Sequence, residues 1–138
     1  VGVFHITDDV ELFAQAAVGQ ADPPPPLIPA EAVRGSIIAS ACRWYAFKVE
    51  SLDDSQERVS IVARVISRGV QREFLGFNRA KHAVIEAAIL ATRIHLIGPA
   101  ELQSELARLA IPVQKTGAAA EHRAFNFLRE YIVRHSGR

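Results

Sequence analysis

Two cations, Arg79 and Lys81, open a predicted helix that has an apolar body. Asn78 comes just before them, and an asparagine there can cap the helix by accepting a hydrogen bond from a free backbone N–H. Cations in a first turn oppose the helix dipole by roughly a few tenths of a kcal/mol each, so their placement indicates an anionic partner. The alternative is that both side chains only reach solvent. Asn78, Arg79 and Lys81 are therefore candidate binding residues.

A predicted hairpin carries a second candidate site. It pairs residues 41–52 with residues 57–68 across a turn. Strict alternation predicts that Trp44 faces the same side as Arg64 and Arg68, where an indole beside guanidinium groups forms a stacking platform. The alternative is that this side covers a helix or a partner subunit, with the arginines at its rim.

The other side of this hairpin is the expected core face of the sheet. Its apolar residues alternate along both strands, as expected for a half-buried sheet. They are Tyr45, Phe47, Val49, Val59, Ile61, Ala63 and Val65.

Motifs for metal binding or nucleophilic catalysis are weak or missing. His82 and Glu86 lie four residues apart on one helix face, a spacing that an ion pair or hydrogen bond explains as well as a metal does. Cys42 has no cysteine partner and no histidine near it in the sequence, so a buried structural thiol is expected. No Gly-x-Ser-x-Gly elbow or phosphate-binding glycine loop occurs. We therefore predict no metal site and assign no catalytic residue; any redox chemistry would need a bound cofactor.

The elements that must position these residues form a β part followed by a helical part. Thr7 is the expected cap of a first helix, which ends near Gly19. Four successive prolines then predict a stiff connector, with a ligand for a proline-reading module as the alternative. The expected elements are a strand at 1–6, the hairpin, and helices at 79–96, about 100–109 and about 118–135, with an extended link from Pro112 to Lys115. We place the boundary between residues 76 and 77 and expect one compact unit.

Composition narrows the class of protein. The chain has 138 residues, of which 49% are hydrophobic, as in a folded globular domain. Its net charge of +1 is too balanced for a protein that mainly grips nucleic acid. No uninterrupted apolar stretch is long enough for a membrane span, and a single cysteine suits a reducing compartment, so we expect a cytoplasmic protein. Because the chain opens on strand-like residues and contains no methionine, we also expect that upstream residues are missing.

Several long runs together resemble a known family. They are residues 3–14 (VFHITDDVELFA), 41–45 (ACRWY), 76–81 (GFNRAK) continuing through 91–93 (ATR), and 113–117 (VQKTG) with Ala124 and Phe125. In this order they resemble the uncharacterised prokaryotic family of FMN-binding split β-barrel proteins, over essentially the whole chain.

The resemblance implies an α+β fold, a partial split β-barrel followed by a C-terminal helical subdomain. It also implies an FMN cofactor, a homodimer with flavin near the subunit interface, and N-terminal strands that precede Val1 and are missing from this chain. The family's marked stretches include six candidate cofactor-binding residues, namely Thr7, Arg43, Trp44, Asn78, Arg79 and Lys81.

Two functions follow as expectations. The first is an FMN-dependent oxidoreductase acting on an unidentified small molecule. The alternative is a non-catalytic dimeric flavin-binding or assembly module. A role in nucleic-acid binding is not expected, because acidic residues interrupt every predicted helix.

Overall fold

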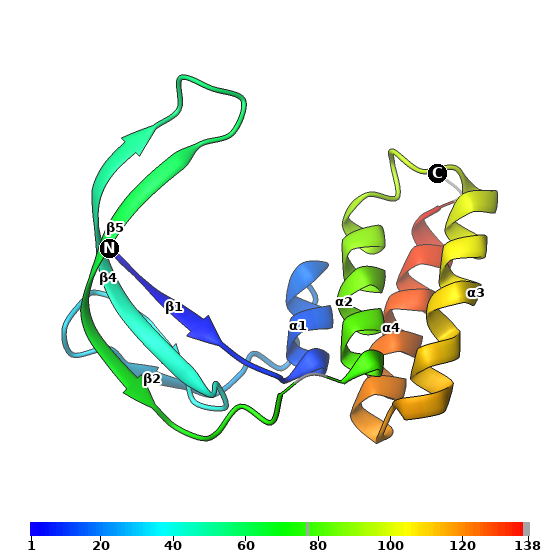
Figure 1. The fold of residues 1–138 in the computed structure, drawn as a ribbon, viewed down its shortest axis with the longest axis horizontal. Helices are drawn as coiled ribbons and strands as arrows, with labels where there is room; N and C mark the ends of the chain where they lie inside the picture. The colour runs from blue at the N-terminus through cyan, green and yellow to red at the C-terminus, as the bar shows by residue number, and fades with distance from the viewer. Residues whose placement is uncertain (77, 137–138) are drawn as a thin grey trace. The chain divides into compact units, whose positions relative to one another are not determined.

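The computed structural model describes residues 1–76 and 78–136, which form a mixed α+β fold (Figure 1). The α+β class expected from the sequence is confirmed. Two compact units are present: a β unit of residues 1–8 and 25–74, and a helical unit of residues 9–24 and 75 onward. The sequence predicted one compact unit divided at residue 76. The first helix belongs with the other helices instead, because its buried Val10 and Ala14 join their hydrophobic core.

The β unit is built on an antiparallel sheet with the strand order β1-β4-β5. These strands are β1 (Gly2–Ile6), β4 (Arg43–Asp53) and β5 (Ser60–Val70). The strand β1 pairs with β4 only as far as Phe47, so the rest of β4 has β5 as its one partner strand in this sheet. Figure 1 shows the β4–β5 hairpin continuing well past the end of β1.

A second, two-stranded sheet pairs β2 (Leu27–Pro29) with β3 (Ser36–Ile38). The sequence predicts a stiff connector where β2 lies and no strand at β3, since short strands after a proline run give little periodic signal. Ile37 of β3 packs with Ala46 of β4 in a small apolar cluster. The backbone N–H of Ile38 also donates to Nε2 of His5 over 3.0 Å, which ties β3 to β1.

The far part of the hairpin, residues 48–66, is exposed on both sides and is called the distal hairpin below. The expected core face is wrong here: Val59, Ile61 and Val65 are each at least half exposed. The pairing itself agrees with the expectation, because Phe47 lies opposite Val65 and Val49 opposite Ala63. Alternation therefore identified which residues share a side, but no described element of the β unit packs over that side.

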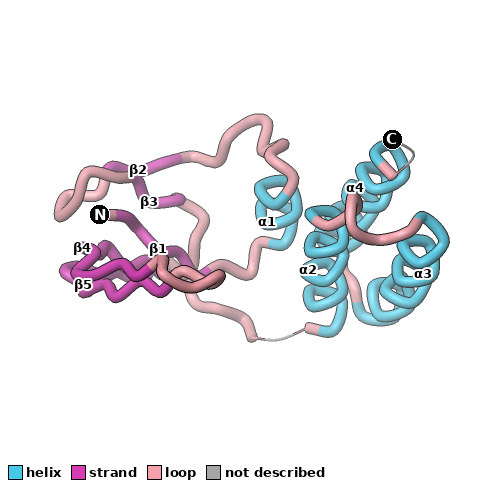
Figure 2. Tube along the Cα trace, turned by 90° about the horizontal axis from the view of Figure 1, so that it is seen from above, coloured by secondary structure: helices cyan, strands magenta, loops and turns pink. Residues whose placement is uncertain are grey.

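In the described residues of the helical unit, four helices share one apolar core. Figure 2 shows the course of these helices. They are α1 (Val10–Ala17), α2 (Arg79–Thr92), α3 (Pro99–Thr116) and α4 (Ala119–His135). The helix α2 faces its neighbours with alanines and Val84, which allow close approach, while α3 and α4 contribute larger side chains such as Leu102 and Leu128. Within this unit α2 packs against α1, α3 and α4.

Two helix boundaries differ from those predicted from the sequence. The cap of α1 is Asp9, whose carboxylate accepts from Leu12 N over 3.1 Å, and not Thr7. The helix α3 continues through Pro112, where an extended link was expected. Proline inside a helix removes a hydrogen bond. The helix continues because Leu102, Leu106, Leu109 and Val113 form one buried stripe that spans the proline.

Candidate functional site

Asn78 is a structural cap. Its Oδ1 accepts from Ala80 N over 2.7 Å, as the sequence predicted. Its Nδ2 donates to the carbonyl oxygen of Thr116 over 3.2 Å, which joins the start of α2 to the end of α3. Both polar groups of this side chain therefore hold helices in place. Phe77, part of the same sequence motif, lies outside the described residues.

Lys81 is held by a buried carboxylate. Its Nζ lies 3.0 Å from Glu121 Oε1, and only 5% of the Glu121 side chain is exposed. The other carboxylate oxygen accepts from Ala118 N over 2.8 Å at the start of α4. Burial acts to raise the pKa of Glu121, but the bonds from Lys81 and Ala118 outweigh it and lower the pKa. This cation therefore neutralises an acid of its own unit, a partner that no local sequence pattern indicates.

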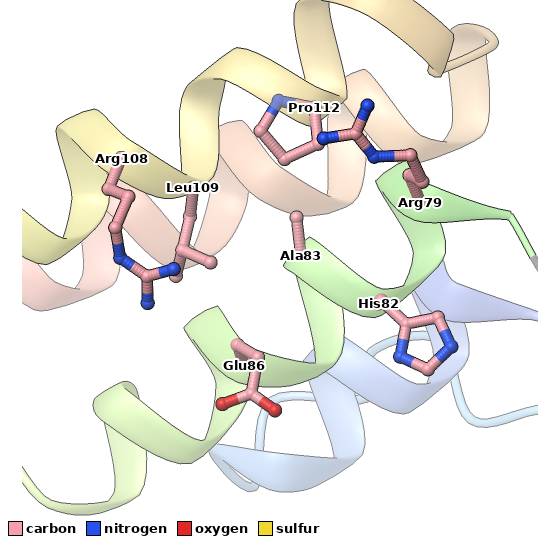
Figure 3. Close-up of a pocket in the computed structure, with 7 residues that line it drawn as sticks. All are labelled: Arg79, His82, Ala83, Glu86, Arg108, Leu109 and Pro112. Carbon is pink, nitrogen blue, oxygen red and sulfur yellow. The ribbon is translucent and has the colours of Figure 1, made fainter.

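Arg79 lines a pocket of about 240 Å³ between α2 and α3 (Figure 3). Ala83, Leu109 and Pro112 give it an apolar surface, and Arg108 lies at the other end from Arg79. Two further lining residues, His82 and Glu86, come from α2. Arg108 is already bound by Glu105 through contacts of 2.6 and 3.1 Å. The pocket therefore contains one cation committed to a neighbouring acid, which weakens it as an anion site.

His82 and Glu86 both line this pocket, which agrees with the prediction that they share one face of the helix. Among the described residues, no group of three histidine, cysteine, aspartate or glutamate side chains could hold a metal ion.

A different pocket, of about 410 Å³, lies on the β4–β5 hairpin, in the part of β4 that pairs with β1. Arg43 and Tyr45 line it from β4, and Arg68, Gly69 and Val70 line it from β5. We call this the arginine pocket. Its size lies within the range of about 300–1,000 Å³ typical of small-molecule sites. Arg43 was a predicted cofactor-binding residue and Arg68 was expected beside Trp44, whereas Tyr45 was assigned to the core face of the sheet.

The strand register explains why these residues share one side. Tyr45 lies directly opposite Arg68, and Arg43 lies opposite Val70. The register shifts by one residue at a β-bulge between Ala46 and Phe47. Because of this shift, Arg68 lies on the side of Tyr45 and not on the side that strict alternation predicts. The expected platform of Trp44 with Arg64 and Arg68 is therefore wrong.

Trp44 lies on the opposite side of the sheet from the arginine pocket, facing Gly69 in the register. A side chain at Gly69 would meet the indole at 2.6 Å, so glycine is required there for the ring to lie flat against β5. The half-buried indole also packs against the small cluster formed by Ala30, Val33, Ile37 and Ala46. Arg64, the other expected partner, instead forms a 2.6 Å ion pair with Glu50.

Thr7 lies between β1 and α1, next to a buried polar cluster that sequence reasoning missed. Asp8 is only 9% exposed and binds Arg72 Nη2 at 2.5 Å. The fully buried Cys42 thiol lies 3.6 Å from the same carboxylate, which confirms the expected structural cysteine. The signal in the sequence is the acidic pair Asp8 and Asp9 directly after a strand, of which Asp9 caps α1 and Asp8 joins this cluster.

The six predicted site residues divide between the two units. Thr7, Arg43 and Trp44 belong to the β unit, with Arg43 and Trp44 on opposite sides of β4. Asn78, Arg79 and Lys81 belong to the helical unit. The arrangement in the β unit offers an open pocket with cationic donors, the chemistry that binds an anionic small molecule.

Comparison with known families identifies the chain. Residues 1–72 match the family described as "Protein of unknown function (DUF447) N-terminal domain", and residues 78–130 match "Protein of unknown function (DUF447)". The chain therefore belongs to the DUF447 family. A sequence comparison with curated proteins finds no match.

A solved structure has the same fold. It is the crystal structure of an FMN-bound DUF447 protein from Methanosarcina mazei, which aligns with a TM-score of 0.78 at 20% sequence identity. The alignment covers 94% of this chain and 70% of that chain. In the part of the chain that the structure describes, none of the helices combines the length and apolar character needed to cross a bilayer.

Proposed function

We propose that this chain is an FMN-binding protein. The observation that carries the proposal is the shared fold, over 94% of the chain, with a DUF447 protein that is FMN-bound. The family resemblance in the sequence implies the same cofactor. That resemblance and the shared fold thus support the same cofactor class.

The chemistry of the β unit fits this cofactor. FMN carries an anionic phosphate and a planar ring, and it therefore needs cationic donors beside an open surface that contains aromatic groups. Arg43 and Tyr45 supply such groups in the arginine pocket. When bound, FMN would supply two-electron redox chemistry; the residues of this chain would bind and orient it.

A split β-barrel is the architecture that we propose for the β unit. The long β4–β5 hairpin, the short β1 and the β2–β3 pair supply strands for such a barrel. The distal hairpin carries many exposed apolar side chains, among them Leu52, Ile61 and Val62. An exposed apolar surface of this kind marks an interaction site. We therefore also propose a homodimer, in which a second copy covers part of this surface.

The proposed reaction is an FMN-dependent oxidation or reduction of a small molecule. A non-catalytic flavin-binding or assembly module is the second candidate, and the exposed apolar residues of the distal hairpin favour it, since such surface suits contact with a partner. Anaerobic mixing with a nicotinamide donor separates the two. Bleaching of the flavin band at a catalytic rate supports the enzyme, and a band that persists supports the module.

Titration tests the cofactor directly. The purified chain, stripped of flavin, is added to a fixed concentration of FMN while flavin fluorescence is followed. We expect a saturable change in FMN fluorescence and a parallel change in emission from Trp44, the single tryptophan. An unrelated protein of similar size serves as the control. FMN fluorescence that stays constant throughout the titration would overturn the proposal.

Sedimentation velocity tests the dimer over a range of protein concentrations, with and without FMN. We expect the mass of two chains at the higher concentrations. A single species with the mass of one chain under every condition would contradict the dimer.

A further inference from the structure

The arginine pocket holds two cations, Arg43 and Arg68. Neither Arg43 nor Arg68 forms an ion pair or a side-chain hydrogen bond in the part of the chain that the structure describes. Several arginines outside this pocket are paired: Arg64 binds Glu50, Arg72 binds Asp8, and Arg123 binds Glu11. The two pocket arginines thus differ from these in having their donors available.

The strand register places both cations within reach of one ligand. Arg68 lies opposite Tyr45, and Tyr45 lies two residues from Arg43 on the same side of β4. Arg43 and Arg68 are therefore diagonal neighbours across the strand pair, a spacing of about 7–8 Å that long side chains bridge. A single ligand between them would receive donors from both guanidinium groups.

The pocket is also free of opposing charge. Its lining contains two arginines, one phenol, one glycine and one valine, and no carboxylate. The pocket between α2 and α3 contrasts with it, since Glu86 lines that pocket and Glu105 binds its Arg108. A formal charge of two without a counter-charge matches a dianion better than a monoanion, and guanidinium groups bind phosphate oxygens in pairs.

We propose that Arg43 and Arg68, with Tyr45 beside them, form a binding site for a phosphomonoester dianion on the hairpin. The proposal deepens the proposed function and rests on it where the phosphate is that of FMN. The same chemistry would bind the phosphate of a second small molecule, and the experiment below distinguishes the two sources.

The first part of the test compares FMN with riboflavin, which lacks the phosphate. Both are titrated into the full chain and into Arg43→Gln, Arg68→Gln and the double variant. The matched control is Arg58→Gln, an exposed arginine in the turn of the same hairpin and outside the pocket. Circular dichroism and thermal unfolding of each variant check that the fold is kept.

If the site holds the phosphate of FMN, each pocket substitution weakens FMN binding by about tenfold or more and leaves riboflavin binding unchanged. The control variant binds both flavins as the unaltered chain does. This result supports the site and identifies the cofactor as the source of the phosphate.

The second part uses inorganic phosphate and needs no flavin. Amide resonances of the full chain are followed by NMR during a phosphate titration. We expect saturable shifts at Tyr45, Arg68 and Val70 that disappear in the double variant. If these shifts occur while FMN affinity is unchanged in the variants, the site stands and its phosphate comes from another small molecule.

The proposal is overturned if phosphate causes no saturable shift in the pocket and the pocket variants bind FMN as tightly as the unaltered chain. In that result the proposed function still stands, because FMN binds. If the unaltered chain binds no FMN at all, the proposed function fails, and the phosphate titration alone decides whether the site exists.

Discussion

The helical unit and the distal hairpin use apolar residues in opposite ways. In the helical unit these residues are buried in one core shared by four helices, with Leu128 and Val84 fully enclosed. In the distal hairpin, Ile61 is 56% exposed and Val62 is 54% exposed. The first region is stable through its own packing, whereas the second presents apolar surface that contributes little to folding. Apolar residues in this sequence therefore mark a buried core in the helical unit and an exposed surface in the distal hairpin.

The sharpest test of this comparison truncates one residue in each region. Leu128→Ala should lower the free energy of unfolding by about 3 kcal/mol, because it leaves a cavity in a closed core. Ile61→Ala should change it by less than about 0.5 kcal/mol, since its side chain already faces solvent. Urea unfolding at low protein concentration measures both. Equal losses would show that the distal hairpin is packed in the isolated chain.

The next test separates the two cations at the start of α2. Lys81→Ala leaves the buried Glu121 carboxylate without its cation, which should cost about 2 kcal/mol of unfolding free energy. Arg79→Ala is the matched control on the same helix turn and should cost less than about 0.5 kcal/mol, because Arg79 is exposed at the edge of its pocket. Thermal and urea unfolding check both. If the two variants are equally stable, the Lys81–Glu121 pair is not formed.

A substitution in the sheet near β1 should cost an amount of unfolding free energy between those of the two regions. A substitution at Gly69 tests this expectation. Gly69→Ala places a methyl group 2.6 Å from the Trp44 indole, so the ring must move off β5. We expect a loss of about 1–2 kcal/mol in unfolding free energy and a shift in the emission of the single tryptophan. Gly98→Ala has no neighbour within 4 Å and is the control. Unchanged emission in Gly69→Ala would contradict the flat packing of Trp44.

The smallest expected effect is a dependence on pH at His5. Desolvation lowers the pKa of His5 below its usual value near 6.5, and its Nε2 accepts a hydrogen bond only while it is unprotonated. The unfolded chain therefore takes up the proton first as pH falls. This contribution to stability is present above about pH 6.5 and is lost as pH falls through the folded pKa.

His5→Gln provides the comparison, since a glutamine can accept the bond from Ile38 N without titrating. We expect its unfolding free energy to vary less between pH 7 and pH 5 than that of the unaltered chain, by up to about 1 kcal/mol. Exchange of the Ile38 amide with solvent, followed by NMR, should quicken on acidification in the unaltered chain alone. Identical pH profiles in both chains would show that His5 makes no such bond.

The helical unit was largely predictable, because local chemistry fixes it. Asn78 caps α2 as expected, Pro99 lies at the start of α3, and the buried alanines of α2 repeat at helical spacing. The prediction failed at Pro112 because it considered only the hydrogen bond that a proline removes from a helix. The buried stripe of α3, which compensates for that loss, is not a local feature. The prediction also failed at Thr7, because Asp9, two residues on, is the better placed cap.

The candidate site was less predictable, because it depends on a bulge. Alternation assigned Phe47 and Val65 correctly to one side, but the bulge after Ala46 exchanged the sides for residues nearer β1. Arg68 therefore lies with Arg43 and Tyr45, and Trp44 lies on the other side. The partner of Lys81 was also hidden, since Glu121 is forty residues away and its meeting with Lys81 depends on how α2 packs against α4.

Binding of FMN by this DUF447 chain can be tested with a single absorption spectrum. The purified chain is incubated with excess FMN, freed of unbound flavin by gel filtration, and examined by visible absorption. We expect the protein peak to carry the absorption bands of flavin, and riboflavin to be retained less well. A protein peak without flavin absorption after incubation with excess FMN would contradict this expectation.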